Sequence, residues 1–155
     1  MSKTSVRTLI ALSALLVLGG VNYSIYAKER IKKDGEVIYL RLAPVDPRSL
    51  MQGDYMALRF SIASEVDSQR TADHRIPLQL DERRIATLGG PASTLHLGYR
   101  IHSGQVWIGT NAYFFEEGTA DRYAGAQYGK FRVDAKTGEA VLVGLCDGEL
   151  RDLGR

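Results

Sequence analysis

The sequence predicts a mainly β protein, with a single N-terminal transmembrane helix followed by a small antiparallel β barrel or sandwich that carries two short helical turns. Residues 8–27 contain no charged side chain, and later runs alternate apolar with polar residues between glycine-containing turns. That alternation is the pattern of strands with one buried face. The expected segments are a cytoplasmic tail (1–7), a transmembrane anchor (8–27), a juxtamembrane linker (28–35), a β domain (36–147) and a frayed C-terminal tail (148–155).

The length of the uncharged run predicts the anchor. A helix rises about 1.5 Å per residue, so residues 8–27 cover about 30 Å, the thickness of the hydrocarbon core of a bilayer. A cleaved signal peptide is the alternative. Cleavage after Ala27 would place Ile25 at −3, where a small residue is needed. We therefore expect the span to be retained.

The charges that flank the span support two opposite membrane orientations. Counting positive residues on either side of the span would keep the C-terminal domain in the cytoplasm, whereas a short basic tail before an anchor and a folded domain favours the opposite orientation. The cations after the span suit anionic headgroups, and stop-transfer explains them equally well. From Lys28 onward 18 Lys and Arg balance 18 Asp and Glu, which gives no indication of nucleic-acid binding. The flanking cations are Lys3, Arg7, Lys28, Arg30, Lys32 and Lys33.

Residues 46–60 are the most informative run of the chain. Asp46 is a suitable helix N-cap and Pro47 a suitable first helical residue, while Gly53 suits the left-handed position that ends a helix. These signals predict a short helical turn at 47–52. The pattern then changes to period two and predicts a strand to about residue 64, with buried side chains at Met56, Leu58, Phe60 and Ile62.

Alternation and turn residues predict the other elements. We expect a second helical turn within 119–129, with Thr119 as N-cap and Gly129 as its stop. Residues 65–73 are polar and indicate an exposed loop, and 81–88 indicate either a hairpin or a short helix. The expected strands are 37–42, a strand at 76–80 that Pro77 places at a sheet edge or a bulge, 95–101 joined by a hairpin turn to 106–108, 113–116, and 131–133 joined by another to 141–145.

No arrangement of nucleophiles, acids and bases predicts catalysis. Ser49 would need a desolvated lysine as its base, and no lysine occurs between residues 33 and 130. His96 and His102 share a strand face about 20 Å apart, too far to hold one metal ion. The sole cysteine, Cys146, is expected to be a buried thiol. The sequence therefore predicts no catalytic residue, metal site or cofactor.

Charged residues flank two aromatic segments. If residues 46–54 and 116–122 meet in space, their arginines and carboxylates would pair beside Tyr55 and Tyr113 and lock the two helical turns together. The alternatives are a polar pocket for a small ligand or a partner's backbone, and paired carboxylates for acid–base catalysis. The group comprises Asp46, Arg48, Asp54, Glu116, Glu117, Asp121 and Arg122.

The aromatic run at 113–115 predicts a surface patch. At period two, Tyr113 and Phe115 point to one side and Phe114 to the other. One of these sides faces away from the core, so Phe114 and Trp107 are expected on an exposed apolar patch. Such patches contact other proteins or membranes.

Residues 44–60 resemble the signature of the GDYXXLXY family of bacterial membrane-anchored proteins. Phe60 stands where that family has its final tyrosine, and residues 113–118, 128–129 and 132–134 resemble its C-terminal part. The resemblance implies a single-pass anchor in the inner (cytoplasmic) membrane, a periplasmic or extracytoplasmic β domain, and a multi-spanning membrane protein as partner. The residues that match the motif are Gly53, Asp54, Tyr55 and Leu58.

The expected function is that of a membrane-anchored accessory or interaction subunit, without catalysis. The alternative is a small-ligand-binding or hydrolytic domain that uses the polar cluster around Arg48, Asp54 and Glu116. The candidate binding or structural residues are Asp46, Arg48, Ser49, Gly53, Asp54, Tyr55, Tyr113, Glu116 and Arg122.

Overall fold

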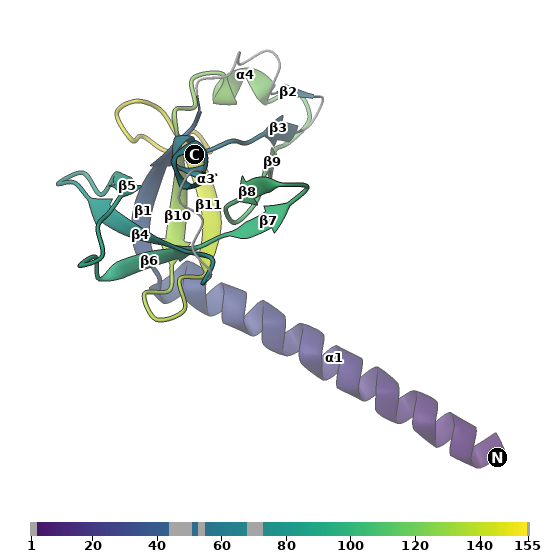
Figure 1. Ribbon diagram of the computed structural model, residues 1–155. Coiled ribbons are helices and arrows are strands. Elements are labelled where there is room, and N and C mark those ends of the chain that lie inside the picture. The colour runs from purple at the N-terminus through teal and green to yellow at the C-terminus, as the bar shows by residue number, and fades with distance from the viewer. Residues whose placement is uncertain (1–2, 44–50, 53–54, 68–72, 155) are drawn as a thin grey trace.

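The computed structural model describes residues 3–43, 51–52, 55–67 and 73–154. A long helix leaves a β domain from one side (Figure 1). The described helices are α1 (Lys3–Asp34), α3 (Ser61–Asp67) and α4 (Ala120–Tyr123). The described strands are β1 (Glu36–Arg41), β2 (Met51–Gln52), β3 (Tyr55–Ala57), β4 (Arg75–Leu80), β5 (Ala86–Leu88), β6 (Leu95–Gly98), β7 (Arg100–His102), β8 (Gln105–Trp107), β9 (Ala112–Phe114), β10 (Tyr128–Val133) and β11 (Ala140–Cys146).

Helix α1 is long and apolar enough to cross a membrane. Its residues are rich in leucine and alanine and contain no proline, which favours an unbroken helix. The large apolar side chains of its N-terminal two thirds are exposed, as expected of a surface made for lipid. Residues 28–34, expected as a linker, continue the same helix, so no break separates the predicted span from the domain.

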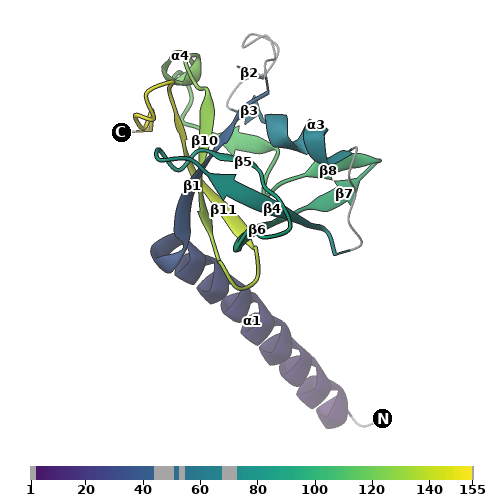
Figure 2. The same ribbon diagram turned by 60° about the vertical axis from the view of Figure 1, so that its left-hand side comes forward.

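The C-terminal end of α1 is attached to the sheet that follows it. Ile31 is buried, with 5% of its surface exposed. The backbone N–H of Gly35 donates to the Ile31 carbonyl, and the Arg132 guanidinium donates to the Gly35 carbonyl at 2.8 Å. Lys28 forms an ion pair with Glu139 in the β10–β11 connection. Figures 1 and 2 both show this end of the helix against the domain.

The strands form small antiparallel sheets. Their orders are β1-β10-β11, β2-β3-β9, β5-β4-β6 and β7-β8. A bridge between Tyr39 and Ile85 links the first sheet to β5, and a bridge between Leu42 and Phe60 links the end of β1 to the segment after β3. The predicted mainly β class is confirmed. The sheets are open, and the described residues form no closed barrel.

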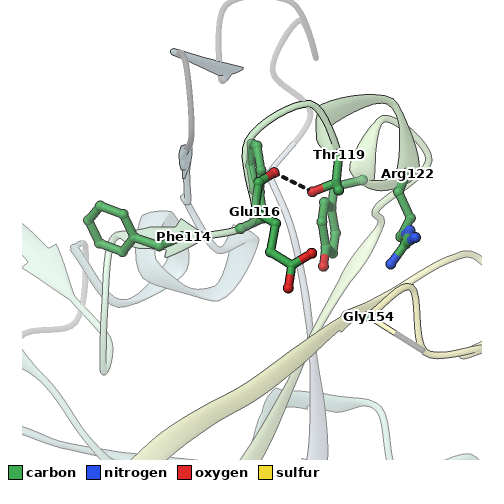
Figure 3. Close-up of a pocket in the computed structure, with 7 residues that line it drawn as sticks. Phe114, Glu116, Thr119, Arg122 and Gly154 are labelled. Carbon is green, nitrogen blue, oxygen red and sulfur yellow. Dashed lines mark hydrogen bonds between the residues drawn. The ribbon is translucent and has the colours of Figure 1, made fainter.

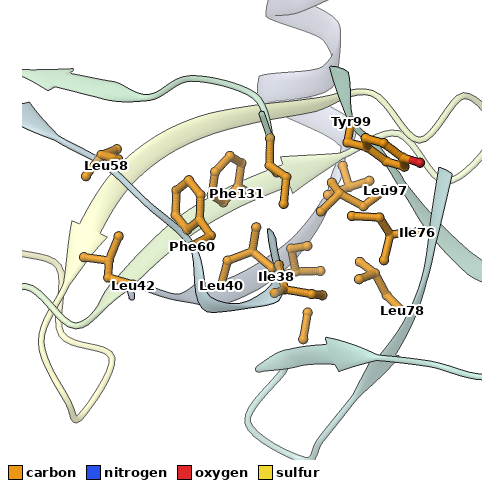
Figure 4. Packing of buried hydrophobic residues seen from close by; sticks show 14 of the residues in the cluster. Ile38, Leu40, Leu42, Leu58, Phe60, Ile76, Leu78, Leu97, Tyr99 and Phe131 are labelled. Atoms are coloured by element: carbon orange, nitrogen blue, oxygen red, sulfur yellow. The ribbon is translucent and has the colours of Figure 1, made fainter. Parts of the chain in front are cut away.

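The core lies between these sheets (Figure 4). Alternation along β1 buries Ile38 and Leu40, and alternation along β4 buries Ile76 and Leu78. Phe131 on β10 has no exposed surface and packs edge-on against Phe60, with ring centroids 5.2 Å apart. Burial of each large apolar side chain contributes about 1.5–3 kcal/mol.

Two glycines make room for the Phe131 ring. A Cβ atom on Gly109 would lie 2.9 Å from Phe131 Cε1, and one on Gly129 would lie 3.1 Å from Phe131 Cε2 and 2.8 Å from Phe60 Cε1. The distances of 2.9 and 2.8 Å are closer than a Cβ atom can approach another carbon, and the distance of 3.1 Å is tight. Gly129 is therefore a packing residue inside β10, and its predicted role as a helix stop is wrong.

The helical turn predicted at 47–52 is wrong at its C-terminal end. Met51 and Gln52 form β2, which pairs antiparallel with β3 in the register Met51↔Met56 and Gln52↔Tyr55. Residues 44–50 and 53–54 lie outside the described residues. A Gly-Asp pair between apolar runs is a hairpin signal as much as a helix stop, and here the flanking residues pair as strands.

The strand expected to reach residue 64 ends at Ala57 and gives way to α3. The alternating residues Leu58, Phe60 and Ile62 are all buried, as expected. Ile62 is also four residues from Val66, which is buried too, so the two share one face of a helix. The helical spacing therefore prevails from Ser61, and it also replaces the first part of the loop expected at 65–73.

Strand β4 is central in its sheet, and its register with β6 runs through Pro77 without a shift, so the predicted edge position or bulge is wrong. The Pro77 carbonyl accepts from the Gly89 backbone N–H at 2.8 Å, just beyond the end of the short strand β5. Because the N–H and C=O of a strand residue point to the same side, the donor that proline lacks faces the margin of the sheet. Residues 81–88 form the hairpin alternative, not the helix.

The other hairpins are confirmed, with one interruption. The run 95–101 divides at Tyr99 into β6, which pairs with β4, and β7, which pairs with β8. Ser103 and Gly104 both have positive φ, as a two-residue hairpin turn requires. Gly138, with a φ of 75°, lies in the connection between β10 and β11.

The C-terminal residues fold back onto the sheet instead of fraying. Asp152 forms a bridge with Cys146, and the Leu153 backbone N–H donates to the Leu145 carbonyl at 2.9 Å. The Asp147 carboxylate accepts from the backbone N–H groups of Glu149 and Arg151, which closes the intervening loop. These local bonds satisfy the backbone that a frayed end would leave to water.

Candidate functional site

The structure describes four of the nine candidate residues. Tyr55 lies on β3, Tyr113 on β9, Glu116 just after β9, and Arg122 in α4. The other five, Asp46, Arg48, Ser49, Gly53 and Asp54, lie outside the described residues.

The strands next to the two charged segments pair with each other, as β3 and β9. Tyr55 lies opposite Phe114, and Met56 lies opposite Tyr113. The predicted clasp of opposite charges depends on Arg48 and Asp54 and therefore stays a prediction. Glu116 and Arg122 lie in the same region as Phe114 of β9 (Figure 3).

Among the described residues of the β domain, Phe114 is the most exposed large apolar residue. Its surface is 75% exposed, while the neighbouring Tyr113 and Phe115 turn toward Tyr123, as period two predicts. The Tyr55 ring lies beside the Phe114 ring at 5.7 Å between centroids, in a tilted arrangement. Figure 3 shows Phe114 on the side of this region opposite Arg122. Trp107 is half-buried and therefore less exposed than predicted. The exposed part of the predicted patch is centred on Phe114.

Three oxygen atoms gather around Gly154, in the folded-back tail. A Cβ atom on Gly154 would lie 3.4 Å from Asp152 Oδ1, 3.6 Å from the Tyr113 hydroxyl and 3.7 Å from the Tyr123 hydroxyl. Burial, a hydrogen bond to Tyr123 and the nearby Asp152 carboxylate raise the pKa of Tyr113 to about 12. The hydroxyl is therefore a neutral hydrogen-bonding group near pH 7.

A hollow of about 430 Å³ opens on one side of Gly154. Glu116 and Arg122 line it from opposite sides and do not form an ion pair with each other (Figure 3). Thr119 occupies the predicted N-cap position of α4. Its hydroxyl donates to the Glu116 carbonyl at 2.6 Å and does not cap the helix. The arrangement offers one carboxylate and one guanidinium to a small polar group.

A second hollow, of about 340 Å³, opens on the other side of Gly154. It joins the last turn of α1 to the outer face of β10, through Lys32, Lys130 and Arg132. Lys130 pairs with Asp152 at 3.5 Å. The sequence alone did not indicate this cluster of cations, because Lys130 and Arg132 occupy the solvent side of an alternating strand pattern. The positive charge arises because α1 brings Lys32 to them.

The described residues give no sign of a metal centre or an activated nucleophile. They contain no group of three or more His, Cys, Asp or Glu that could hold a metal ion. His102 packs against Trp107 and His74 against Tyr99, with ring centroids 5.0 and 5.3 Å apart. Cys146 is fully buried, and burial raises the pKa of its thiol, which confirms the predicted buried thiol.

Comparison with known proteins identifies the family. The model of the GDYXXLXY protein family matches residues 17–145, from the middle of α1 to the penultimate residue of β11. No curated protein and no solved structure matches significantly. The match covers most of the chain and includes both motif segments that carried the resemblance. This chain therefore belongs to the GDYXXLXY family.

Proposed function

We propose that the protein is a membrane-anchored accessory subunit that binds a multi-spanning membrane protein through a face centred on Phe114. In this proposal α1 is a single-pass anchor in the inner membrane and the β domain lies on the periplasmic side. The long apolar surface of α1 supports the anchor, and the short basic N-terminal tail supports the orientation.

The exposed ring of Phe114 is the observation that carries the proposal. A phenylalanine that is 75% exposed leaves apolar surface in water that a partner would cover. Burying such a ring contributes about 1.5–3 kcal/mol, or roughly a 10- to 150-fold gain in affinity. Tyr55 supports the ring from one side, so the contact surface is already formed before binding.

The position of β9 adds a second reason. β9 is at one end of the order β2-β3-β9, so one of its edges has no paired strand among the described residues. An extended segment of a partner can add to such an edge through main-chain hydrogen bonds while a neighbouring side chain supplies specificity. Phe114 would be that side chain.

Photocrosslinking in native membranes tests the proposal. A photoreactive phenylalanine analogue at position 114 should form a covalent adduct with a multi-spanning membrane protein. The matched control carries the analogue at Thr87, an exposed residue of β5 in a different sheet, and should give no such adduct. No adduct from position 114, or the same adducts from both positions, would overturn the proposed face.

A second candidate function is binding of a small ligand at the two hollows beside Gly154. The observation that favours it is the gathering of Lys32, Lys130 and Arg132 on one side and of Glu116 and Arg122 on the other. Thermal stabilisation of the full chain by a small dicarboxylate or phosphate compound, abolished by Arg122→Gln, would support this function. Unchanged melting across such a panel would count against it.

A further inference from the structure

We propose that a hollow between β8 and α3 is a binding site for an acidic sugar, with Arg59 holding the acid group and Trp107 contacting a face of the sugar ring. The acid group is a carboxylate or a phosphate, which a guanidinium binds in the same way, through paired N–H donors. The lining of this hollow does not include Phe114. The inference therefore goes beyond the proposed function and does not rest on it.

The hollow forms where two paired chains separate. β3 and β9 pair as far as Ala57 and Ala112, and the Leu58 backbone N–H donates to the Asn111 carbonyl at 2.7 Å. From there one chain continues to α3 and the other runs back to β8, and Figures 1 and 2 both show α3 beside β8. The space between them is about 560 Å³, which lies within the range of small-molecule sites, roughly 300–1,000 Å³.

Arg59 is placed at this hollow by the alternation around it. Leu58 and Phe60 are buried in the core (Figure 4), so the residue between them points away from the core. Arg59 is exposed and lines the hollow, and its backbone carbonyl accepts from the Ala43 N–H at 2.8 Å. Its guanidinium forms no ion pair or hydrogen bond within the described part of the chain. A ligand can therefore take its paired donors without breaking an internal contact.

Polar groups from other elements converge on the same hollow. Gln105 of β8 and Asn111 before β9 are exposed and line it, and their carboxamides form no hydrogen bond with any residue that the structure describes. A carboxamide both donates and accepts, as neighbouring sugar hydroxyls do. Trp107 is half-buried and adds an apolar ring with one N–H donor. The His102 ring packs against it with centroids 5.0 Å apart.

The charge of the lining selects the class of ligand. No acidic residue is among the described residues that line the hollow, and Glu65, which follows the lining residue Ser64, is not one of them. An anion therefore meets one guanidinium and no carboxylate there. A purely apolar ligand would leave the carboxamides without partners. A ring with an apolar face, several hydroxyls and one acid group satisfies all three kinds of side chain.

Fluorescence titration tests the site directly, because the chain contains a single tryptophan and it lines the hollow. The full-length protein would be kept in a polyoxyethylene detergent, since a detergent with a sugar headgroup would compete. Glucuronic acid, glucose-6-phosphate and glucose would be titrated at matched ionic strength. We expect a saturable change with at least one of the two acids, and binding about tenfold or more tighter than that of glucose. The tighter of the two acids identifies the acid group as carboxylate or phosphate.

Matched variants assign the binding to this hollow. Arg59→Gln should remove the difference between the acids and glucose, whereas Arg83→Gln, an exposed arginine between β4 and β5, should leave it unchanged. Asn111→Ala should weaken binding of the acid roughly 2- to 10-fold. Equal melting temperatures would show that the variants are folded, and the wild-type titration needs no variant. No saturable change with either acid, acids bound no tighter than glucose, or the same loss with Arg83→Gln would overturn the site.

Discussion

The same substitution at two phenylalanines should separate the core from the binding face. Phe131→Leu removes a ring that has no exposed surface and that fits between Gly109, Gly129 and Phe60. Phe114→Leu removes a ring that is three quarters exposed. The first change should destabilise the fold and the second should not, whereas partner binding should weaken with the second change in a chain that remains folded.

The magnitude follows from the packing. Loss of the aromatic pair with Phe60 costs about 0.5–1.5 kcal/mol, and the space that leucine does not fill costs roughly 1 kcal/mol more. Phe131→Leu should therefore lower the free energy of unfolding by about 1.5–2.5 kcal/mol, which corresponds to a fall of roughly 5–12 °C in melting temperature for a domain of this size. Phe114→Leu should stay within about 0.5 kcal/mol of the wild type.

Urea denaturation of the full-length protein in detergent micelles, followed by Trp107 fluorescence, measures both values. The slope of the transition should be the same for the two variants and the wild type, because a slope change would mean a different unfolded or native state. Equal midpoints for Phe131→Leu and the wild type would refute the packing of the ring between the two glycines.

Two further predictions concern the titratable groups of the fold. The pKa of Tyr113 is raised to about 12, above the unfolded value of about 10, so its neutral hydroxyl stabilises the fold below about pH 10, and this contribution is lost as the pH rises toward about 12. Tyr113→Phe should therefore flatten the loss of stability between those pH values in urea titrations, and an unchanged profile would contradict the burial of this hydroxyl. Cys146 is buried and burial raises the pKa of its thiol, so it should resist a maleimide at pH 7.5 and react once the protein is unfolded in urea; rapid labelling of the native protein would show that β11 is open at its end.

Period two predicted most of the strands, because burial of one face is a local property of the sequence. The alternation gave a wrong prediction where the same residues also fit the spacing of a helix. Ile62 continues the alternation of the preceding strand and also pairs at helical spacing with Val66, and only the packed structure shows that the helix prevails. Pro77 indicated an edge strand or a bulge, but it lies in a central strand. The short strand β5 ends opposite Leu78, so no strand residue needs the N–H donor that Pro77 lacks.

A glycine can serve several structural roles, and the sequence alone does not show which role a given glycine has. Gly129 follows a helical segment and was expected to end it, whereas it lies in β10 because the Phe60 and Phe131 rings occupy the space of a side chain. Likewise, residue spacing indicated that Tyr113 and Phe115 share a side. It could not indicate that the C-terminal tail brings Asp152 and Gly154 to them, because that contact depends on how the chain end folds back.

The most direct test of the proposed function is recovery of the partner from native membranes. The full-length chain, tagged at its C-terminus, would be purified in a mild detergent alongside Phe114→Ala and the control Thr87→Ala, and the recovered proteins quantified by mass spectrometry. We predict that a multi-spanning membrane protein is recovered with the wild type and the control, and is reduced roughly tenfold or more with Phe114→Ala. Recovery of the chain alone, or equal recovery of the partner with all three proteins, would contradict an accessory subunit that binds through Phe114.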